Sequence, residues 1–189
     1  IIDLCAAPGG KAFQILSQNT DVLLNDISSK RIKLLEDNLK RLRFDTKITN
    51  INLLNFQETK KFDVVVLDSP CSGIGTIRRN PEILFKKNMP DIEKLVNIQK
   101  KLINKASKLL KKRGILIYMV CSFFYKETKN IKKFFLENNK NFSQIEFTEN
   151  KKKLVNIFVD DEGDISCLPG TYKENKIDGF YSVKFIKND

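Results

Sequence analysis

The sequence contains no histidine, and this absence removes several kinds of active site. A Ser–His–Asp triad, a zinc site with histidine ligands and a histidine general base are all excluded within this chain. Apolar runs are short, and none approaches the roughly 20 residues of a membrane span. No charged segment followed by an apolar one opens the chain, so we expect neither a membrane protein nor a secreted one.

Cysteines are few and widely spaced. The four of them, Cys5, Cys71, Cys121 and Cys167, form no C-x-x-C pair, so the sequence predicts no zinc or thioredoxin-like site and no metal. We expect a cytoplasmic protein whose thiols stay free. A free cysteine is commonly a small buried apolar residue, so only its surroundings can mark one as a catalyst.

Acidic residues are outnumbered, with 23 Asp and Glu against 34 Lys and Arg, which gives a net charge of +11. A basic surface suits an anionic partner such as a nucleic acid. Abundant Lys, Asn and Ile also fit the composition of an AT-rich genome, so charge alone leaves both explanations open. The 189 residues predict a single domain over 1–189. Because Ile1 already lies in a strand pattern, we expect a catalytic fragment of a longer protein.

Short apolar runs alternate with longer amphipathic ones. The pattern predicts strands over 22–26, 47–51, 62–67, 115–120, 142–147 and 179–186. It predicts helices over 28–43, 91–112 and 126–138, with Ser28 as the cap of the first and Gly114 as the end of the second. Residues 150–178 are expected to be irregular. This alternation predicts an α/β fold, with helices on both faces of a parallel sheet and right-handed crossovers.

Polar and small residues follow four of the predicted strands. They are residues 3–11, Asp26, residues 68–75 and the pair Cys121-Ser122. In a parallel α/β sheet, ligands bind beyond the carboxyl ends of the strands. We therefore expect these four segments to meet at one edge and to form the functional site.

The first segment, DLCAAPGGK, places small residues between a strand and a helix. Its loop consists of Cys5, Ala6, Ala7, Pro8, Gly9, Gly10 and Lys11. It matches neither GxGxxG nor a GxxxxGK[ST] phosphate loop, and it suits a nucleoside better than a pyrophosphate. Asp26 ends the next strand, where a carboxylate accepts hydrogen bonds from ribose hydroxyls or caps the following helix. Together these features predict an adenosine-containing cofactor, either NAD or S-adenosylmethionine.

The third and fourth segments carry candidate catalytic residues. Asp68 and Cys71 lie in DSPCSGIG, directly after the apolar run FDVVVL, and such residues are poorly suited to a core. Arg78 and Arg79 follow closely and could hold phosphates, although an exposed loop also explains them. Cys121 ends another strand at the same predicted edge, where partial exposure makes a nucleophile plausible.

These segments resemble the motifs of a known family. DLCAAPGGK, DSPCSGIGTIRRNPEI, VCS and DGFYSVKF are similar, in this order, to motifs of the Nop/Sun-type RNA cytosine-C5 methyltransferases, with the RsmB-like ribosomal RNA enzymes nearest. The resemblance covers residues 1–187. It implies a Rossmann-like class I methyltransferase domain, a three-layer sandwich with a mostly parallel sheet and an antiparallel last strand. It also implies S-adenosylmethionine as cofactor and RNA as partner, and we expect a monomer.

The resemblance assigns a role to each catalytic candidate. Cys121 would be the nucleophile, because a thiolate that adds to C6 of cytosine makes C5 reactive toward a methyl group. Cys71 would help to release the methylated product. Asp68 would bind the edge of the base, help protonation at N3 and lie beside the cofactor. Arg78 and Arg79 would contact the RNA.

The resemblance also implies the cofactor contacts. The loop over residues 5–11 would surround the cofactor, and Asp26 would hold the ribose. The position near the adenine, usually Asp in the family, falls on Asn52, which keeps an acceptor and adds a donor. Ser69 stands in place of the usual Ala and Val120 in place of the usual Thr, and both are small changes.

Several functions remain open beside ribosomal RNA methylation. A tRNA substrate is the nearest alternative. In a DNA cytosine methyltransferase the Pro-Cys residue, Cys71, would be the nucleophile, and the VCS segment argues against this. A non-catalytic RNA-binding or ribosome assembly factor could use the same fold. The missing GxGxxG and histidine disfavour a nicotinamide dehydrogenase.

Overall fold

The computed structural model describes residues 1–57, 60–85, 91–147 and 158–189. The strands are β1 (Ile2–Asp3), β2 (Leu23–Asn25), β3 (Ile48–Thr49), β4 (Phe62–Asp68), β5 (Leu110–Val120), β6 (Phe142–Ile145), β7 (Ile165–Cys167), β8 (Gly170–Tyr172), β9 (Asn175–Ile177) and β10 (Phe180–Lys187). The α-helices are α1 (Gly10–Leu16), α2 (Ser29–Leu42), α3 (Ile92–Ser107) and α4 (Lys129–Asn138). Short 3₁₀ turns are η1 (Leu53–Asn55), η2 (Ile74–Thr76), η3 (Pro81–Leu84) and η4 (Tyr125–Glu127).

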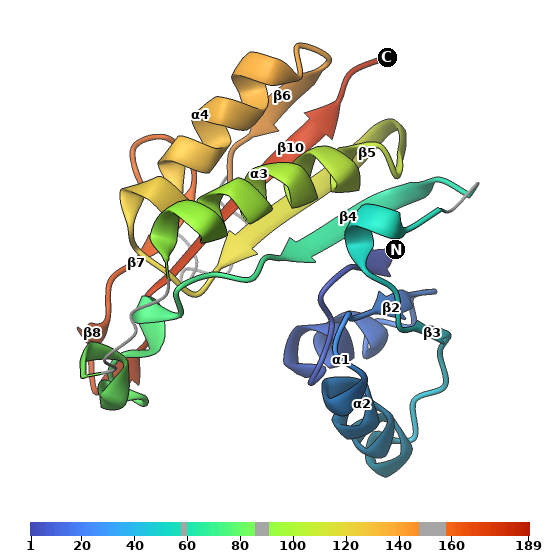
Figure 1. Cartoon of the computed structure of the whole chain (residues 1–189), viewed down its shortest axis with the longest axis horizontal. Helices are drawn as coiled ribbons and strands as arrows, with labels where there is room; N and C mark the ends of the chain where they lie inside the picture. The colour runs from blue at the N-terminus through green and yellow to red at the C-terminus, as the bar shows by residue number, and fades with distance from the viewer. Residues whose placement is uncertain (58–59, 86–90, 148–157) are drawn as a thin grey trace.

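The main sheet has the strand order β3-β2-β1-β4-β5-β10-β6 (Figure 1). Strands β1 to β5 pair in parallel, whereas β10 runs antiparallel to both β5 and β6. Strand β7 pairs with the first residues of β10, and β8 and β9 form a separate hairpin. The mostly parallel sheet and the antiparallel last strand are confirmed.

Helices cover both faces of this sheet, as adjacent residues of β2 show. Leu24 packs in a core cluster with residues of α1 and α2, while Leu23 packs against the larger cluster that includes residues of α3 and α4. Because successive strand residues point to opposite faces, the two pairs of helices lie on opposite sides. In Figure 1, α3 and α4 lie in front of β5 and β10, and α1 and α2 lie beside β2 and β3. The three-layer α/β fold is confirmed.

Helix α2 forms where its local sequence predicts it. The Ser28 side chain accepts a hydrogen bond from the Arg31 backbone N–H, and Ile32, Leu35 and Leu39 are buried on one face. Arg43 ends the helix with a left-handed backbone, φ 58°. These determinants lie within the helix itself, which is why the sequence pattern located it.

The prediction that the second helix runs to residue 112 and ends at Gly114 is wrong. Helix α3 ends at Ser107, and Leu110 already pairs with Phe62 of β4. Gly114 lies in a bulge of β5, where an added Cβ would lie 3.0 Å from the Lys111 carbonyl oxygen and 3.1 Å from that of Asp63. The glycine therefore permits a close approach of two strands, which no local helical pattern reveals.

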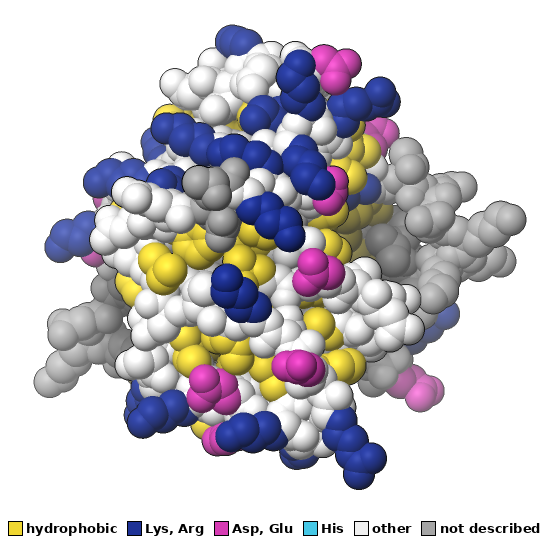
Figure 2. Space-filling model, turned by 90° about the vertical axis from the view of Figure 1, so that its right-hand side faces the viewer, with side chains coloured by type: hydrophobic (Ala, Val, Ile, Leu, Met, Phe, Trp, Pro, Cys, Tyr) yellow, Lys and Arg dark blue, Asp and Glu magenta, His cyan; other side chains and the backbone are white. Residues whose placement is uncertain are grey.

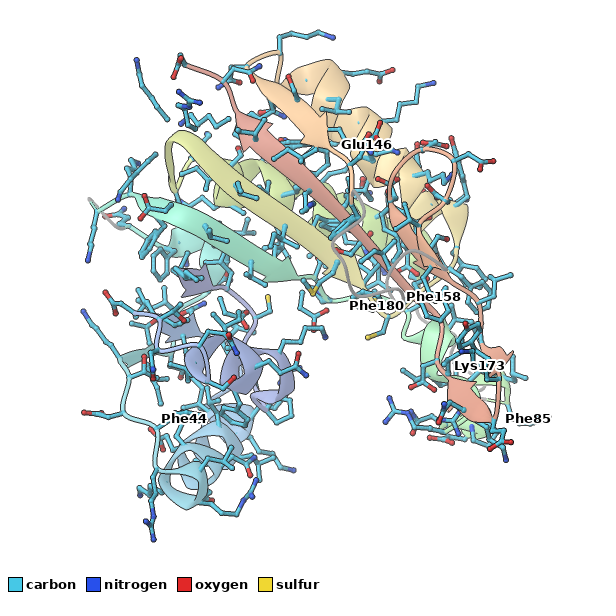
Figure 3. All side chains as sticks on the ribbon, turned by 180° about the vertical axis from the view of Figure 1, so that it is seen from behind. Phe44, Phe85, Glu146, Phe158, Lys173 and Phe180 are labelled. Atoms are coloured by element: carbon cyan, nitrogen blue, oxygen red, sulfur yellow. The ribbon has the colours of Figure 1, made fainter. Side chains whose placement is uncertain are left out.

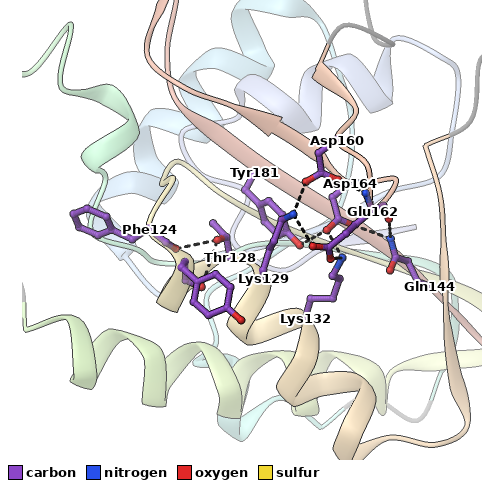
Figure 4. Close-up of polar contacts among 10 residues, drawn as sticks. Phe124, Thr128, Lys129, Lys132, Gln144, Asp160, Glu162, Asp164 and Tyr181 are labelled. Carbon is purple, nitrogen blue, oxygen red and sulfur yellow. Dashed lines mark hydrogen bonds and ion pairs between the residues drawn. The ribbon is translucent and has the colours of Figure 1, made fainter.

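The expectation that residues 150–178 are irregular is also corrected for the part that the structure describes. Residues 150–157 lie outside the described ranges, but residues 165–177 form β7, β8 and β9. A hairpin before β7 spans residues 159–165, and Val159 pairs with Ile165 across it. An ion-pair cluster stabilises this hairpin. The cluster consists of Lys129, Lys132, Asp160, Glu162, Asp164 and Tyr181, and Figure 4 shows its contacts.

Candidate active site

The carboxyl ends of β1, β2, β4 and β5 surround a cavity of about 380 Å³. It is lined by Cys5, Ala7, Asp26, Ile27, Arg31, Asp68, Ser69, Pro70, Cys71 and Cys121. All four segments that the sequence placed at this edge contribute to the lining, so their convergence is confirmed. Figure 3, which views the molecule from behind, shows sulfur atoms near Phe180, the first residue of β10.

The first loop is fixed by its backbone. The Ala6 N–H donates to the carbonyl of Asn25, and the Cys5 N–H donates to a buried carboxyl oxygen of Asp3 at 3.2 Å. Gly9 has φ 116°, and a Cβ there would lie 2.0 Å from the ring of Phe13. The loop thus needs glycine at this position, and its small residues leave the backbone of residues 5–7 close to the cavity.

Asp26 lies at the junction of three elements. Its buried carboxylate accepts hydrogen bonds from the backbone N–H groups of Ala7 at 3.2 Å and Ser28 at 2.9 Å. It also pairs with the Arg31 guanidinium at 2.5 Å. Asp26 therefore joins the first loop to the start of α2, but Ser28, not Asp26, is the cap of that helix. Its place in the cavity lining also keeps the ribose contact as a prediction.

Asp68 pairs with Lys11 across the cavity edge. The Lys11 Nζ lies 2.5 Å from Asp68 Oδ2 and 5.7 Å from the centre of the Phe180 ring. Burial works against the charge of Lys11, but the Asp68 carboxylate raises the pKa of Lys11 overall. The pair therefore brings a stable cation from the first loop to the carboxylate at the end of β4.

The thiols in the cavity differ in their electrostatic surroundings. Burial raises the pKa of Cys71 to about 12, the charge of Glu127 adds to this, and backbone hydrogen bonds from Gly73 and Cys121 oppose it. Burial, together with Asp68, also raises the pKa of Cys121 above its ordinary value, and the cations Lys11 and Arg79 oppose this rise only in part. Cys71 is therefore held as a neutral thiol at neutral pH, and Cys121 has cations that favour its thiolate.

Cys5 is the third thiol of the cavity, and no catalytic role is predicted for it. Burial and the nearby carboxylates of Asp3 and Asp26 raise the pKa of Cys5 to about 12. It lines the cavity, and the Arg31 cation opposes the rise without overcoming it. This agrees with a packing role in the loop. Cys167 lies in β7, away from the cavity lining.

Arg78 and Arg79 both contact Asp178, the residue two before β10. Arg79 Nε lies 2.5 Å from Asp178 Oδ2, and Arg78 Nη2 lies 3.3 Å from Oδ1. Next to this pair, the Gly75 N–H donates to the Cys121 carbonyl and the Gly179 N–H donates to the Gly75 carbonyl. The arginine loop is thus attached to the Cys121 loop, and the side chain of Arg79 remains 58% exposed.

Asn52 lies apart from the other predicted cofactor residues. Its side chain is exposed and accepts a hydrogen bond from the Leu54 N–H at 3.0 Å, which starts η1. It does not line the cavity, so its contact with adenine stays a prediction. Among the described residues, no group of side chains suited to a metal ion is found, and no helix is long and apolar enough to cross a membrane.

Sequence reasoning missed two buried polar residues of this edge. The Asn25 side chain donates to the carbonyls of Leu4 and Ile51 and so connects β1, β2 and the segment after β3. Glu127 is buried beside both cysteine loops. Neither has a local signal, because Asn25 stands at a strand end and Glu127 resembles an ordinary acidic residue at a helix start.

A family model described as 16S rRNA methyltransferase RsmB/F matches residues 1–186. The chain belongs to the RsmB/F methyltransferase family. The ribosomal RNA small subunit methyltransferase B of Shewanella oneidensis is 30% identical over 194 residues, which cover 99% of this chain and 42% of the relative. That of Photorhabdus laumondii is 39% identical over 127 residues, 65% of this chain and 30% of the relative. This RsmB/F chain spans less than half the length of these relatives.

Solved structures agree with the RsmB/F assignment. The crystal structure of PH0851 covers 98% of this chain and 42% of its own, with a TM-score of 0.84 and 28% identity. NSun6 from Pyrococcus horikoshii, solved with SFG, covers 100% and 47%, with a TM-score of 0.79 and 25% identity. The N-methyltransferase NodS of Bradyrhizobium japonicum has a TM-score of 0.61 at 12% identity and shares the fold. The resemblance to RsmB-like enzymes is confirmed.

Proposed function

We propose that this chain is the catalytic domain of an RNA methyltransferase that methylates C5 of a cytosine in small-subunit ribosomal RNA. The observation that carries the proposal is that Cys71 and Cys121, from two separate loops, line one cavity with Asp26 and Asp68. The family description supports ribosomal RNA as the substrate. Action as a monomer in the cytoplasm is part of the same proposal.

The cavity suits S-adenosylmethionine in its chemistry. The Asp26 carboxylate accepts three hydrogen bonds from the protein, and a carboxylate has about four lone-pair sites, so it can still accept one from a ribose hydroxyl. The small side chains of Cys5 and Ala7 leave room for a nucleoside beside the first loop. When bound, S-adenosylmethionine supplies the methyl group that the cytosine receives.

Cys121 is the nucleophile of this proposal. Its thiolate adds to C6 of the cytosine, the C6–S bond forms, and the electron pair of the C5–C6 double bond becomes available at C5. Lys11 and Arg79 favour the thiolate. Asp68 binds the edge of the base, and the proton that the Cys121 thiol loses passes through Asp68 to N3 as the sulfur adds. A base within folded RNA must leave its stack to reach these residues.

Cys71 acts in the last phase of the reaction. After methylation, a water molecule takes the proton from C5, the electron pair of the C5–H bond re-forms the C5–C6 double bond, and the C6–S bond breaks with its electron pair on the Cys121 sulfur. The Cys71 thiol, which its raised pKa keeps protonated, donates a proton toward that leaving sulfur, directly or through water, and regains one from solvent water. Burial raises the pKa of both thiols, but the Glu127 carboxylate adds to the rise at Cys71, whereas Lys11 and Arg79 oppose it at Cys121. This difference in neighbouring charge favours Cys121 as the first nucleophile and disfavours the DNA methyltransferase alternative.

The test uses three cysteine variants, an unmodified 16S rRNA transcript and S-adenosylmethionine. Cys121→Ala should lower methyl transfer by about 10³-fold or more. Cys71→Ala should accumulate a covalent protein–RNA adduct that survives denaturing electrophoresis. Cys167→Ala is the matched control and should behave like the unaltered protein. Full activity of Cys121→Ala, or an adduct that requires Cys71 instead of Cys121, would reject the proposal.

A further inference from the structure

Glu127 is a fully buried carboxylate that faces the two cysteine loops from behind. Its Oε1 accepts from the Ser72 backbone N–H at 2.8 Å and from Gln99 Nε2 at 3.0 Å. Its Oε2 accepts from the Ser72 hydroxyl at 2.5 Å and from the Ser122 hydroxyl at 2.6 Å. We call Glu127, Ser72, Ser122 and Gln99 the Glu127 cluster.

The two serine donors of the cluster are sequence neighbours of the two proposed catalytic cysteines. Ser72 directly follows Cys71, and Ser122 directly follows Cys121. Gln99 of α3 also donates to the carbonyl of Pro70, the residue before Cys71. One carboxylate thus joins the loop after β4 to the loop after β5, and a helix on the same side of the sheet supports the connection.

In all four of its contacts the Glu127 side chain presents a carboxyl oxygen as the acceptor. The donors are neutral, and no salt bridge among the described residues includes Glu127. A buried carboxylate of this kind is costly to retain for packing alone, because desolvation disfavours it. Glu127 instead holds the two cysteine loops at a fixed distance from each other, because it accepts hydrogen bonds from Ser72 in one loop and Ser122 in the other.

We propose that Glu127 is a positioning residue that fixes the Cys71 loop relative to the Cys121 loop, and that the release step depends on it more than the first addition does. The proposal rests on the function proposed above. Addition requires Cys121, the base and Asp68, and the pairing of Asp68 with Met119 in the sheet already fixes Asp68 relative to the Cys121 loop. Release requires a proton from Cys71 at the sulfur of Cys121, so it depends on the distance between the two loops.

Glu127→Gln tests this with little change of shape. The amide keeps one oxygen for the Ser72 N–H and Gln99, and its nitrogen can donate to a serine hydroxyl, but the second shared acceptor is lost. Ser122→Ala removes the contact to the Cys121 loop and leaves Glu127 itself in place. Ser107→Ala is the matched control, because Ser107 is a buried α3 serine that donates within its own helix, to the Asn104 carbonyl.

The assay uses purified protein, unmodified 16S rRNA transcript and S-adenosylmethionine. Glu127→Gln should lower kcat by up to about 100-fold, change the KM for S-adenosylmethionine by less than about twofold, and accumulate the covalent adduct. Ser122→Ala should do the same to a smaller extent. Ser107→Ala should give no adduct, even if the substitution lowers the melting temperature of the protein.

Cys71→Ala serves as the positive control that separates the two proposals. If Cys71→Ala yields no adduct, the proposed function itself fails. If Cys71→Ala yields the adduct and Glu127→Gln does not, the positioning role is overturned, whether kcat is unchanged or falls. A kcat loss in Glu127→Gln that is matched by Ser107→Ala would also overturn it, since the effect would then follow from weakened packing.

Discussion

Two polar clusters include residues just before and within α4, and they differ in the groups that face their carboxylates. The Glu127 cluster is buried, whereas the ion-pair cluster is buried only around Lys132 and Asp164. Lys129 and Lys132 of the ion-pair cluster face Glu162 and Asp164, with Lys132 Nζ 2.5 Å from both carboxylates. In the Glu127 cluster, the carboxylate accepts hydrogen bonds from neutral hydroxyl, amide and backbone donors. Two lysines oppose the three carboxylates of the first cluster, whereas no cation among the described residues forms an ion pair with Glu127 in the second.

The difference indicates separate tasks. In the ion-pair cluster, the Tyr181 hydroxyl donates to Asp164 at 2.7 Å, so β10, α4 and the hairpin before β7 are joined (Figure 4). Lys129 and Lys132 lower the pKa of the Glu162 carboxyl to about 2. This arrangement holds the last part of the sheet. The Glu127 cluster connects the loops that carry Cys71 and Cys121, where position matters for chemistry.

The largest expected effect on stability comes from the ion-pair cluster. Lys132→Ala leaves the buried Asp164 without its cation, so the free energy of unfolding should fall by about 3–5 kcal/mol. Urea denaturation measures it. Lys133→Ala is the matched control on the same helix, since Lys133 is exposed and lies 4.0 Å from Glu137. A loss below about 1 kcal/mol for Lys132→Ala, similar to that of the control, would contradict the claim that the ion-pair cluster has a stabilising role.

A second effect comes from Asp3, a buried carboxyl of the catalytic edge. Burial raises its pKa from 3.8 to about 7. Between these values the unfolded chain loses the proton and the folded chain keeps it, so stability should decline as pH rises from about 4 to 7 and then level off. Asp3→Asn should remove this decline and stabilise the protein at pH 8 by up to about 4 kcal/mol. Unfolding curves at pH 4, 7 and 8 that keep a constant difference between the two proteins would contradict this.

A smaller effect concerns the basic charge. Figure 2 shows Lys and Arg side chains spread over the side where β2 and β3 lie, interspersed with acidic and apolar ones, so the charge is not confined to the cavity edge. Arg79→Ala should nevertheless weaken RNA binding and flatten the slope of log K against log salt by about 1. Lys111→Ala is the control, because Lys111 pairs with Asp63 at 2.9 Å near the start of β4. Equal slopes for both variants would place the RNA elsewhere.

The sequence predicted features whose causes are local or periodic. The apolar run FDVVVL marked β4, the Ser28 cap and its spaced leucines marked α2, and the alternation of elements placed Asp68 and Cys121 at one edge. The assignment of roles to Cys71 and Cys121 needed the family resemblance, because burial and neighbouring charge are set by the fold.

Features that depend on contacts between distant residues could not be predicted from the sequence. The end of α3 depends on the pairing of Leu110 with Phe62, and β7 depends on its pairing with β10 and on the ion-pair cluster. Glu127 receives hydrogen bonds from residues up to 55 positions away, so its position in the sequence gave no sign of its contacts. Such residues become visible only when the loops are placed in space.

The most direct test of the central claim is bisulfite sequencing of total RNA from cells with and without the full-length gene. One cytosine of small-subunit ribosomal RNA should resist conversion only when the gene is present, and complementation with Cys121→Ala should not restore that resistance. Two results would contradict the account. One is that no ribosomal cytosine changes when the gene is removed, and the other is that Cys121→Ala restores the resistance in full.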